Sequence, residues 1–138
     1  LKGKVWVADF IFTRCPDACW NMTQTLVGMQ DLLHHHDDLR FVSFSIDPAF
    51  DTPPVLTRYG KLAKVTSAHW WFLTGPMTEI TRVAHSFLLA TLTPDDDILS
   101  HSTEFALVDR DGVIRGYYDL DVPSDIPEMR QAIEKLTR

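Results

Sequence analysis

The hydrophobic and polar positions along the chain follow two periods, which predict alternating strands and helices. Residues 5–12 form a nearly continuous apolar run, typical of a central strand buried on both faces. In residues 19–33 apolar side chains recur with helical spacing, at Met22, Leu26, Met29 and Leu33. Pro16 stands where a first helical turn would start. The segment between these two patterns is therefore expected to be a strand-to-helix junction.

The rest of the chain continues this alternation. Further strands are predicted at 40–46, 70–73, 104–109 and 113–118, and further helices at 53–65, from Pro76 to Phe87, and from about Ser124 or Asp125 onward. Asp51 and Thr52 have the character of residues at a helix start. The residues 110–112 should form a hairpin turn, with glycine at its end. This order predicts one α/β domain over residues 1–138, with a largely parallel sheet, helices on both faces and an antiparallel hairpin at one side.

Composition narrows the class of protein. The chain has 138 residues, of which 45% are hydrophobic and 23% charged, as in an ordinary globular protein. Its net charge of -6 and the absence of a basic stripe argue against a nucleic-acid partner. No apolar window approaches the ~18 residues that would span a membrane. The chain begins at Leu1 and enters a strand at once, so we expect that a signal or anchor segment precedes it.

The chain's two cysteines, Cys15 and Cys19, lie at the predicted junction and allow four interpretations. A structural disulfide gains little there, because so small a loop removes little chain entropy and a helix N-terminus favours thiolate. A redox dithiol more often has the spacing C-x-x-C, although residues four apart share a helix face and can pair. A peroxide-reducing cysteine of the peroxiredoxin kind needs a threonine three positions earlier, where Phe12 and Pro16 stand instead.

The fourth interpretation is a metal site. Two thiolates select soft ions such as Cu(I), zinc or iron–sulfur clusters, and one imidazole added to them would complete a trigonal copper site. Six histidines are available. His34, His35 and His36 are consecutive on a helix, so their side chains point about 100° apart and cannot converge on one ion. His101 differs because it directly precedes a predicted strand, at the place where thioredoxin-like oxidoreductases keep a proline.

Four segments together resemble the SCO/SenC family of copper chaperones for cytochrome c oxidase assembly. They are GKVWVADFIFTRCPDAC, RFVSFSIDPAFDTP, WWFLTG and HSTEFALVDRDGVIRGYY, and they occur in the family's order over most of the chain. The resemblance implies a thioredoxin-like (peroxiredoxin-like) α/β fold with a central mixed sheet. It also implies that Cys15, Cys19 and His101 bind copper as Cu(I), with Cu(II) as a second state. Asp47 matches the family's acidic motif, either to cap the turn with Pro48 or to support the metal loop electrostatically.

The resemblance further implies a place in the cell and partners. The protein would be membrane-anchored through a missing N-terminal segment and extracytoplasmic, on the periplasmic face of the bacterial inner membrane or in the mitochondrial intermembrane space. It would receive copper from another chaperone and pass it to a cytochrome c oxidase subunit. Trp20 departs from the family pattern, which usually has proline after the second cysteine, and Pro54 stands where an acidic residue is common.

Three functions remain open from the sequence. The first is a copper metallochaperone, which transports its cargo and is not an enzyme. The second is a thiol-disulfide oxidoreductase that reduces the copper-ligand cysteines of an oxidase subunit; Cys15 would attack and Cys19 would resolve the mixed disulfide. The third is a redox or copper sensor that signals through a partner. Loss of His101 should separate the first two, because only copper binding needs the imidazole.

Overall fold

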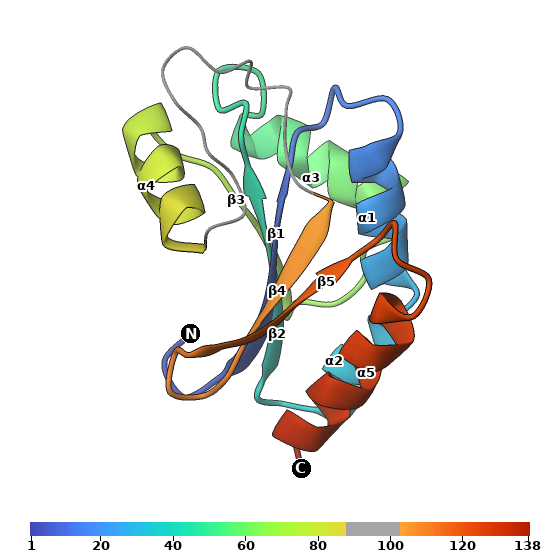
Figure 1. Ribbon diagram of the computed structural model, residues 1–138. Coiled ribbons are helices and arrows are strands. Elements are labelled where there is room, and N and C mark those ends of the chain that lie inside the picture. Colours follow the sequence, from blue (N-terminus) through green and yellow to red (C-terminus); the bar gives the residue numbers. More distant parts are fainter. Residues whose placement is uncertain (88–102) are drawn as a thin grey trace.

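A single mixed sheet forms the centre of the computed structural model, which describes residues 1–87 and 103–138 (Figure 1). Its strand order is β3-β2-β1-β4-β5. Strands β1, β2 and β3 run parallel, whereas β4 is antiparallel to β1 and β5 to β4. The strands are β1 (Val5–Ile11), β2 (Leu39–Ser45), β3 (Trp70–Leu73), β4 (Glu104–Val108) and β5 (Ile114–Asp119). The predicted parallel core and the antiparallel hairpin at one side are both present.

Helices cover both faces of this sheet, as predicted. They are α1 (Ala18–Val27), α2 (Asp31–His35), α3 (Pro53–Leu62), α4 (Met77–Phe87) and α5 (Asp125–Leu136). Figure 1 shows α4 on one side of the sheet and the other four helices on the opposite side. On the α4 side, the ring of Phe87 contacts Trp6 and Phe10 of β1, with centroids 5.4 and 5.8 Å apart. On the opposite side, Met129 and Ile133 of α5 pack with the buried residues of β4.

Two predicted helices end earlier than expected. The helix expected over 19–33 is divided, because Met29 and Gln30 donate their N–H groups to carbonyls only three residues back, in the tighter 3₁₀ manner. This tighter turn follows Gly28, a poor helix former, and the apolar stripe remains buried on both sides of the break. The helix expected to reach residue 65 ends at Leu62, because Lys64 adopts a left-handed backbone conformation with φ of 66°.

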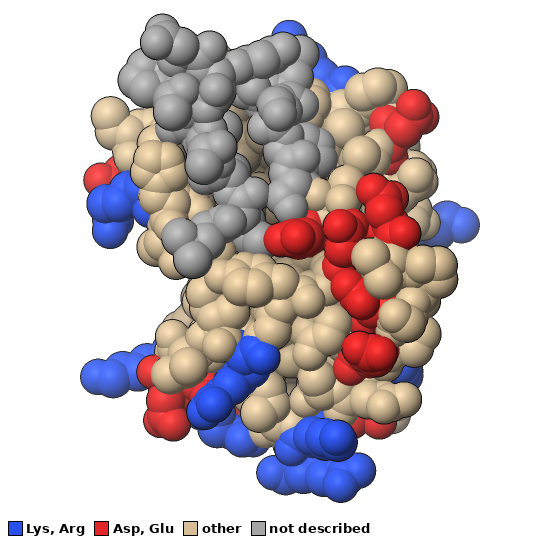
Figure 2. Space-filling model, viewed as in Figure 1, with Lys and Arg blue, Asp and Glu red and all other residues tan. Residues whose placement is uncertain are grey.

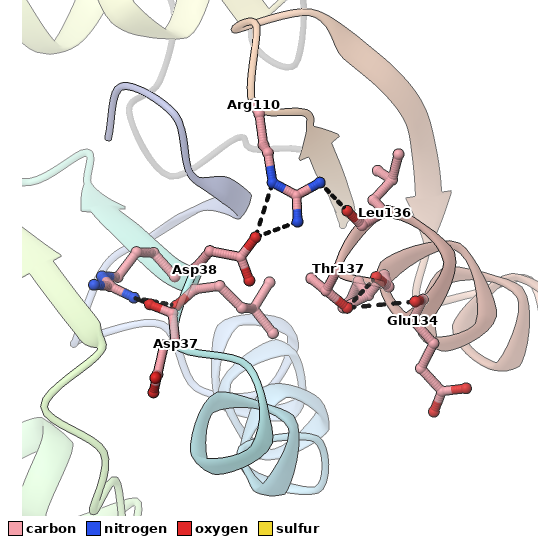
Figure 3. A network of polar contacts seen from close by, with 9 residues as sticks. Asp37, Asp38, Arg110, Glu134, Leu136 and Thr137 are labelled. Atoms are coloured by element: carbon pink, nitrogen blue, oxygen red, sulfur yellow. Dashed lines mark hydrogen bonds and ion pairs between the residues drawn. The ribbon is translucent and has the colours of Figure 1, made fainter.

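The β4–β5 hairpin joins the C-terminal helix at the end of the sheet where β1 begins. Gly112 has φ of 77°, the conformation that the predicted turn requires. Beside it, the guanidinium of Arg110 donates to the carboxylate of Asp38 and to the backbone carbonyl of Leu136, near the end of α5 (Figure 3). The hairpin tip, the turn before β2 and the last turn of α5 are thereby held together. None of the helices in the described ranges is long and apolar enough to cross a membrane.

Candidate functional site

The two cysteines lie where β1 passes into α1, as the sequence predicts. Cys15 is half-buried in the connecting segment, and Cys19 is the second residue of α1 and is fully buried. The N–H of Cys15 donates to the carbonyl of Phe12 at 3.1 Å, and the N–H of Cys19 lies 3.3 Å from the sulfur of Cys15. The helix starts at Ala18, two residues later than the sequence suggests for Pro16. The turn before the helix therefore holds the Cys15 sulfur against the backbone N–H of Cys19, in the first turn of α1.

The two thiols differ in environment. Burial raises the pKa of the Cys19 thiol well above its usual value, and the hydrogen bond with Cys15 adds to this effect. The Cys19 thiol is therefore protonated at neutral pH in this state of the protein. Cys15 is the more accessible of the two cysteines.

A carboxylate that the sequence analysis did not select lies beneath the cysteines. Asp9 is fully buried in β1, where it accepts a hydrogen bond of 2.6 Å from the hydroxyl of Ser43. The indole N–H of Trp70 in turn donates to that hydroxyl at 3.1 Å. Oδ2 of Asp9 has no hydrogen-bond partner among the described residues. Burial raises the pKa of Asp9 to about 7, and its charge contributes to the raised pKa of Cys19.

A second carboxylate, Asp51, holds the segment that precedes Cys15. It is fully buried just before α3. Its carboxylate accepts the backbone N–H of Thr13 at 3.1 Å and also the Thr13 hydroxyl. The hydroxyl of Ser45, at the end of β2, donates to the same carboxylate at 2.8 Å. The expectation that Asp51 is simply a helix-start residue was incomplete, because its side chain bonds to the cysteine-bearing segment 38 positions earlier.

Asp47 supports the same segment through its neighbour, Arg14. The Asp47 side chain is almost fully buried and accepts from Nε and Nη2 of Arg14 at 3.0 and 2.6 Å. The Arg14 guanidinium also lies over the ring of Phe50, 4.5 Å from its centroid. The Asp47 carbonyl accepts the N–H groups of Phe50 and Asp51, which closes the turn after β2. The Asp47 side chain thus contacts the segment that carries Cys15 through Arg14, whereas the turn after β2 is closed by its backbone carbonyl.

Tyr59 of α3 contacts the first turn of α1. Its hydroxyl shares a hydrogen bond of 3.0 Å with the Thr23 hydroxyl and lies 3.5 Å from the carbonyl of Cys19. The ring of Trp20 packs edge-on against Tyr59, with centroids 5.6 Å apart. Trp20, which stands where the family usually has proline, therefore covers the buried tyrosine beside Cys19.

The third expected ligand, His101, lies outside the described residues. The antiparallel register, with Ala106 opposite Ala8, carries the start of β4 toward the end of β1 from which the cysteine segment leaves. Within 1–87 and 103–138, no three side chains of histidine, cysteine, aspartate or glutamate are arranged to hold a metal ion. The described residues thus bring together Cys15 and Cys19, and Asp47 contacts the same segment through Arg14.

The chain is similar to proteins of one known family over its whole length. The family model described as SCO1/SenC matches residues 1–138. The chain belongs to the SCO1/SenC family. The SCO1 protein homolog of Bacillus subtilis is 38% identical over 91% of this chain and 71% of its own length. Among three curated relatives, the chain spans 59% to 71% of the relative's length.

Solved structures of Sco proteins share the fold. A SCO1/SenC family lipoprotein from Bacillus anthracis superposes with a TM-score of 0.85 at 31% identity, over 100% of this chain and 84% of its own. BsSco, a member of the Sco family of cytochrome c oxidase assembly proteins with an identified disulfide switch, gives 0.80 at 32%, over 99% and 81%. Arabidopsis thaliana ScoI with copper bound gives 0.77 at 26%, over 98% and 84%. The predicted thioredoxin-like fold is thereby confirmed.

Acidic side chains gather beside the β5–α5 connection of this Sco domain (Figure 2). The segment 119–128 has four acidic residues and no basic one. Its first residue, Asp119, pairs in the sheet with Glu104, at the start of β4. The backbone N–H of Asp121 and the side-chain hydroxyl of Thr103 donate to the Asp119 carboxylate and lower its pKa, so it is ionised at neutral pH. The surface therefore presents negative charge at the end of the sheet where the cysteine segment leaves β1.

Proposed function

We propose that this Sco domain is a copper-binding metallochaperone that helps to assemble the copper centre of cytochrome c oxidase. Copper is its cargo, held by the sulfurs of Cys15 and Cys19 and the imidazole of His101. The observation that carries the proposal is the paired placement of the two sulfurs, with the N–H of Cys19 reaching the Cys15 sulfur at 3.3 Å. The copper-bound structure of the similar Arabidopsis ScoI supports the same cargo.

The chemistry of the donor atoms fits Cu(I). Thiolates are soft ligands that prefer this ion to harder cations, and an imidazole also tolerates Cu(II). Because burial raises the pKa of the Cys19 thiol, this residue must release its proton when copper binds, so the affinity should rise with pH. The half-buried Cys15 leaves one side of the pair accessible to an incoming ligand, which transfer by ligand exchange requires.

The relatives support the partner and the location that we propose. BsSco is described as an assembly protein of cytochrome c oxidase, which supports an oxidase subunit as the copper acceptor; a second copper chaperone is the proposed donor. The lipoprotein of Bacillus anthracis and the mitochondrial SCO2 of yeast support an extracytoplasmic location. We propose that the protein acts at the periplasmic face of the bacterial inner membrane.

A thiol-disulfide reductase is the second candidate, favoured by the unequal exposure of the two cysteines. In that reaction the Cys15 thiolate attacks a disulfide of the partner, which releases one partner thiolate. The Cys19 thiol then loses its proton and attacks the mixed disulfide, which oxidises the pair and releases the second partner thiol. The disulfide switch of BsSco supports redox activity of such a pair.

Copper binding by His101→Ala tests the first candidate against the second. We expect purified parent protein to retain a single Cu(I) ion, and the variant to lose most of this affinity while its dithiol still reduces a model disulfide. His85→Ala, at an exposed position of α4, is the matched control and should bind like the parent. Parental copper affinity in His101→Ala would show that the third ligand is another residue.

Oxidation of the cysteine pair provides an independent check. A disulfide offers no thiolate, so a protein loaded with Cu(I) under nitrogen and then treated with a thiol oxidant should release its copper. The released ion is measured with a coloured cuprous chelator. Copper that stays bound after complete oxidation would place the site away from Cys15 and Cys19.

A further inference from the structure

A buried carboxylate, that of Asp51, holds the connection between β1 and α1 that carries Cys15. Asp51 itself lies outside this connection and outside α1. Asp51 accepts three hydrogen bonds, and two of them come from Thr13, two residues before Cys15. The third comes from Ser45, at the end of the neighbouring strand β2. The carboxylate therefore links the first cysteine to the rigid sheet and to the start of α3.

This link uses the backbone of the segment as well as a side chain. The N–H of Thr13 donates to Oδ2 of Asp51, so the path of the chain itself is fixed at that point. From there the next turn runs through the Phe12 carbonyl, which accepts the N–H of Cys15. The resulting position of Cys15 is the one in which its sulfur lies 3.3 Å from the Cys19 N–H.

We infer that Asp51 is the positioning residue of the cysteine pair: through Thr13 it holds the Cys15 sulfur beside Cys19 in the geometry that copper binding and disulfide formation both need. This inference rests on the proposed function for its copper readout only. Groups that orient metal ligands typically contribute about 10- to 100-fold in metal affinity, because a loosened ligand must be ordered again when the metal binds. The same loosening lowers the effective concentration of one thiol relative to the other.

Asp51→Asn removes this function with little change in volume. An amide is uncharged and has a single acceptor oxygen, so the Thr13 hydroxyl must turn to accept from its NH2 group, and the remaining bonds lose the strength that an ionised acceptor gives them. We expect the Cu(I) affinity of Asp51→Asn to fall by about 10- to 100-fold. We also expect a several-fold shift toward the dithiol in its exchange with glutathione, in which the dithiol and oxidised glutathione give the protein disulfide and two molecules of reduced glutathione.

Matched variants separate positioning from general destabilisation. Thr13→Val removes the hydroxyl donor alone and should show a smaller loss in the same direction, whereas Thr13→Ser retains the donor and should restore parental values. Asp109→Asn is the control: Asp109 is also a buried acceptor of backbone N–H groups, but it lies in the β4–β5 turn at the opposite end of the sheet. Its copper affinity and disulfide equilibrium should equal those of the parent.

Urea unfolding of each reduced, copper-free variant completes the experiment. The inference is overturned if Asp51→Asn is less stable but keeps parental copper affinity and disulfide equilibrium, or if Asp109→Asn lowers both as much. Should Asp51→Asn fail to fold, the comparison of Thr13→Val with Thr13→Ser decides, because equal values for the two would exclude the link. If the parent protein itself binds no copper, the proposed function fails, while the glutathione equilibrium still tests the role of Asp51.

Discussion

Replacement of Asp9 by asparagine should change how the stability of the folded protein depends on pH. Asp9 is fully buried, and burial raises its pKa from 3.8 to about 7. Between these two pH values the unfolded chain has lost the proton of Asp9, whereas the native protein keeps it. Because the native state binds more protons, the free energy of unfolding falls as pH rises through this range. Above about pH 7 both states are ionised and the loss is complete.

The size of this change in the free energy of unfolding follows from the pKa shift of Asp9. One pKa unit corresponds to about 1.4 kcal/mol, so a rise of about three units lowers the free energy of unfolding by about 4 kcal/mol between pH 4 and pH 7.5. Asp9→Asn removes this titration. Its buried amide has an unpaired NH2 group, which costs about 1 to 3 kcal/mol at every pH and leaves the slope unaffected.

Urea unfolding at half-unit steps from pH 4.5 to pH 8.5, followed by tryptophan fluorescence, measures this difference. The copper-free protein is kept reduced, and the free energy of the parent is subtracted from that of Asp9→Asn at each pH. The difference should rise by several kcal/mol toward pH 7 and then level off. A difference that stays constant within about 0.5 kcal/mol would refute the reasoning, because Asp9 would then titrate alike in both states.

Asp109→Asn serves as the control for this measurement. The N–H of Val113 lowers the pKa of Asp109, so the stability that this carboxylate contributes is present above the unfolded value of 3.8 and is lost only at more acidic pH. The difference between parent and Asp109→Asn should therefore be constant from pH 5 to pH 8.5.

Three further predictions concern stability and are measured by urea unfolding of the reduced protein. Met129→Ala should lower the free energy of unfolding by about 2 to 5 kcal/mol, because Met129 is fully buried where α5 packs on the sheet. Leu62→Ala, at a site 68% exposed, should change it by no more than about 0.5 kcal/mol, and equal losses for the two variants would contradict this packing. Arg110→Ala should cost less than about 1 kcal/mol, since its ion pair is partly exposed to solvent, and a larger loss would show that these contacts stabilise the protein more than an exposed ion pair does. Tyr59→Phe should cost about 1 kcal/mol through the hydrogen bond to Thr23, and no loss would indicate that this bond contributes nothing net.

Local pattern was sufficient for the elements and for the place of the cysteine pair. The apolar run of β1 and the helical spacing after it depend only on neighbouring residues, so the junction that carries Cys15 and Cys19 could be predicted. Element ends were less accurate. The first helix breaks after Gly28 although its apolar stripe continues, and Lys64 adopts a left-handed conformation; hydrophobic spacing reports neither event.

The sequence by itself determined the alternation of strands and helices, the dithiol at a helix start and, through four ordered motifs, the family. Only the tertiary structure decided how the site is supported. In the sequence Asp9 is only a polar residue within an apolar strand, and its raised pKa results from its burial in the fold. Asp51 accepts hydrogen bonds from Thr13 only because β2, with the turn that leads to α3, pairs with β1. The physical reason is the distance along the chain over which each effect operates. A hydrophobic pattern depends on residues close in sequence, whereas desolvation and hydrogen bonds between distant segments exist only once the chain has folded.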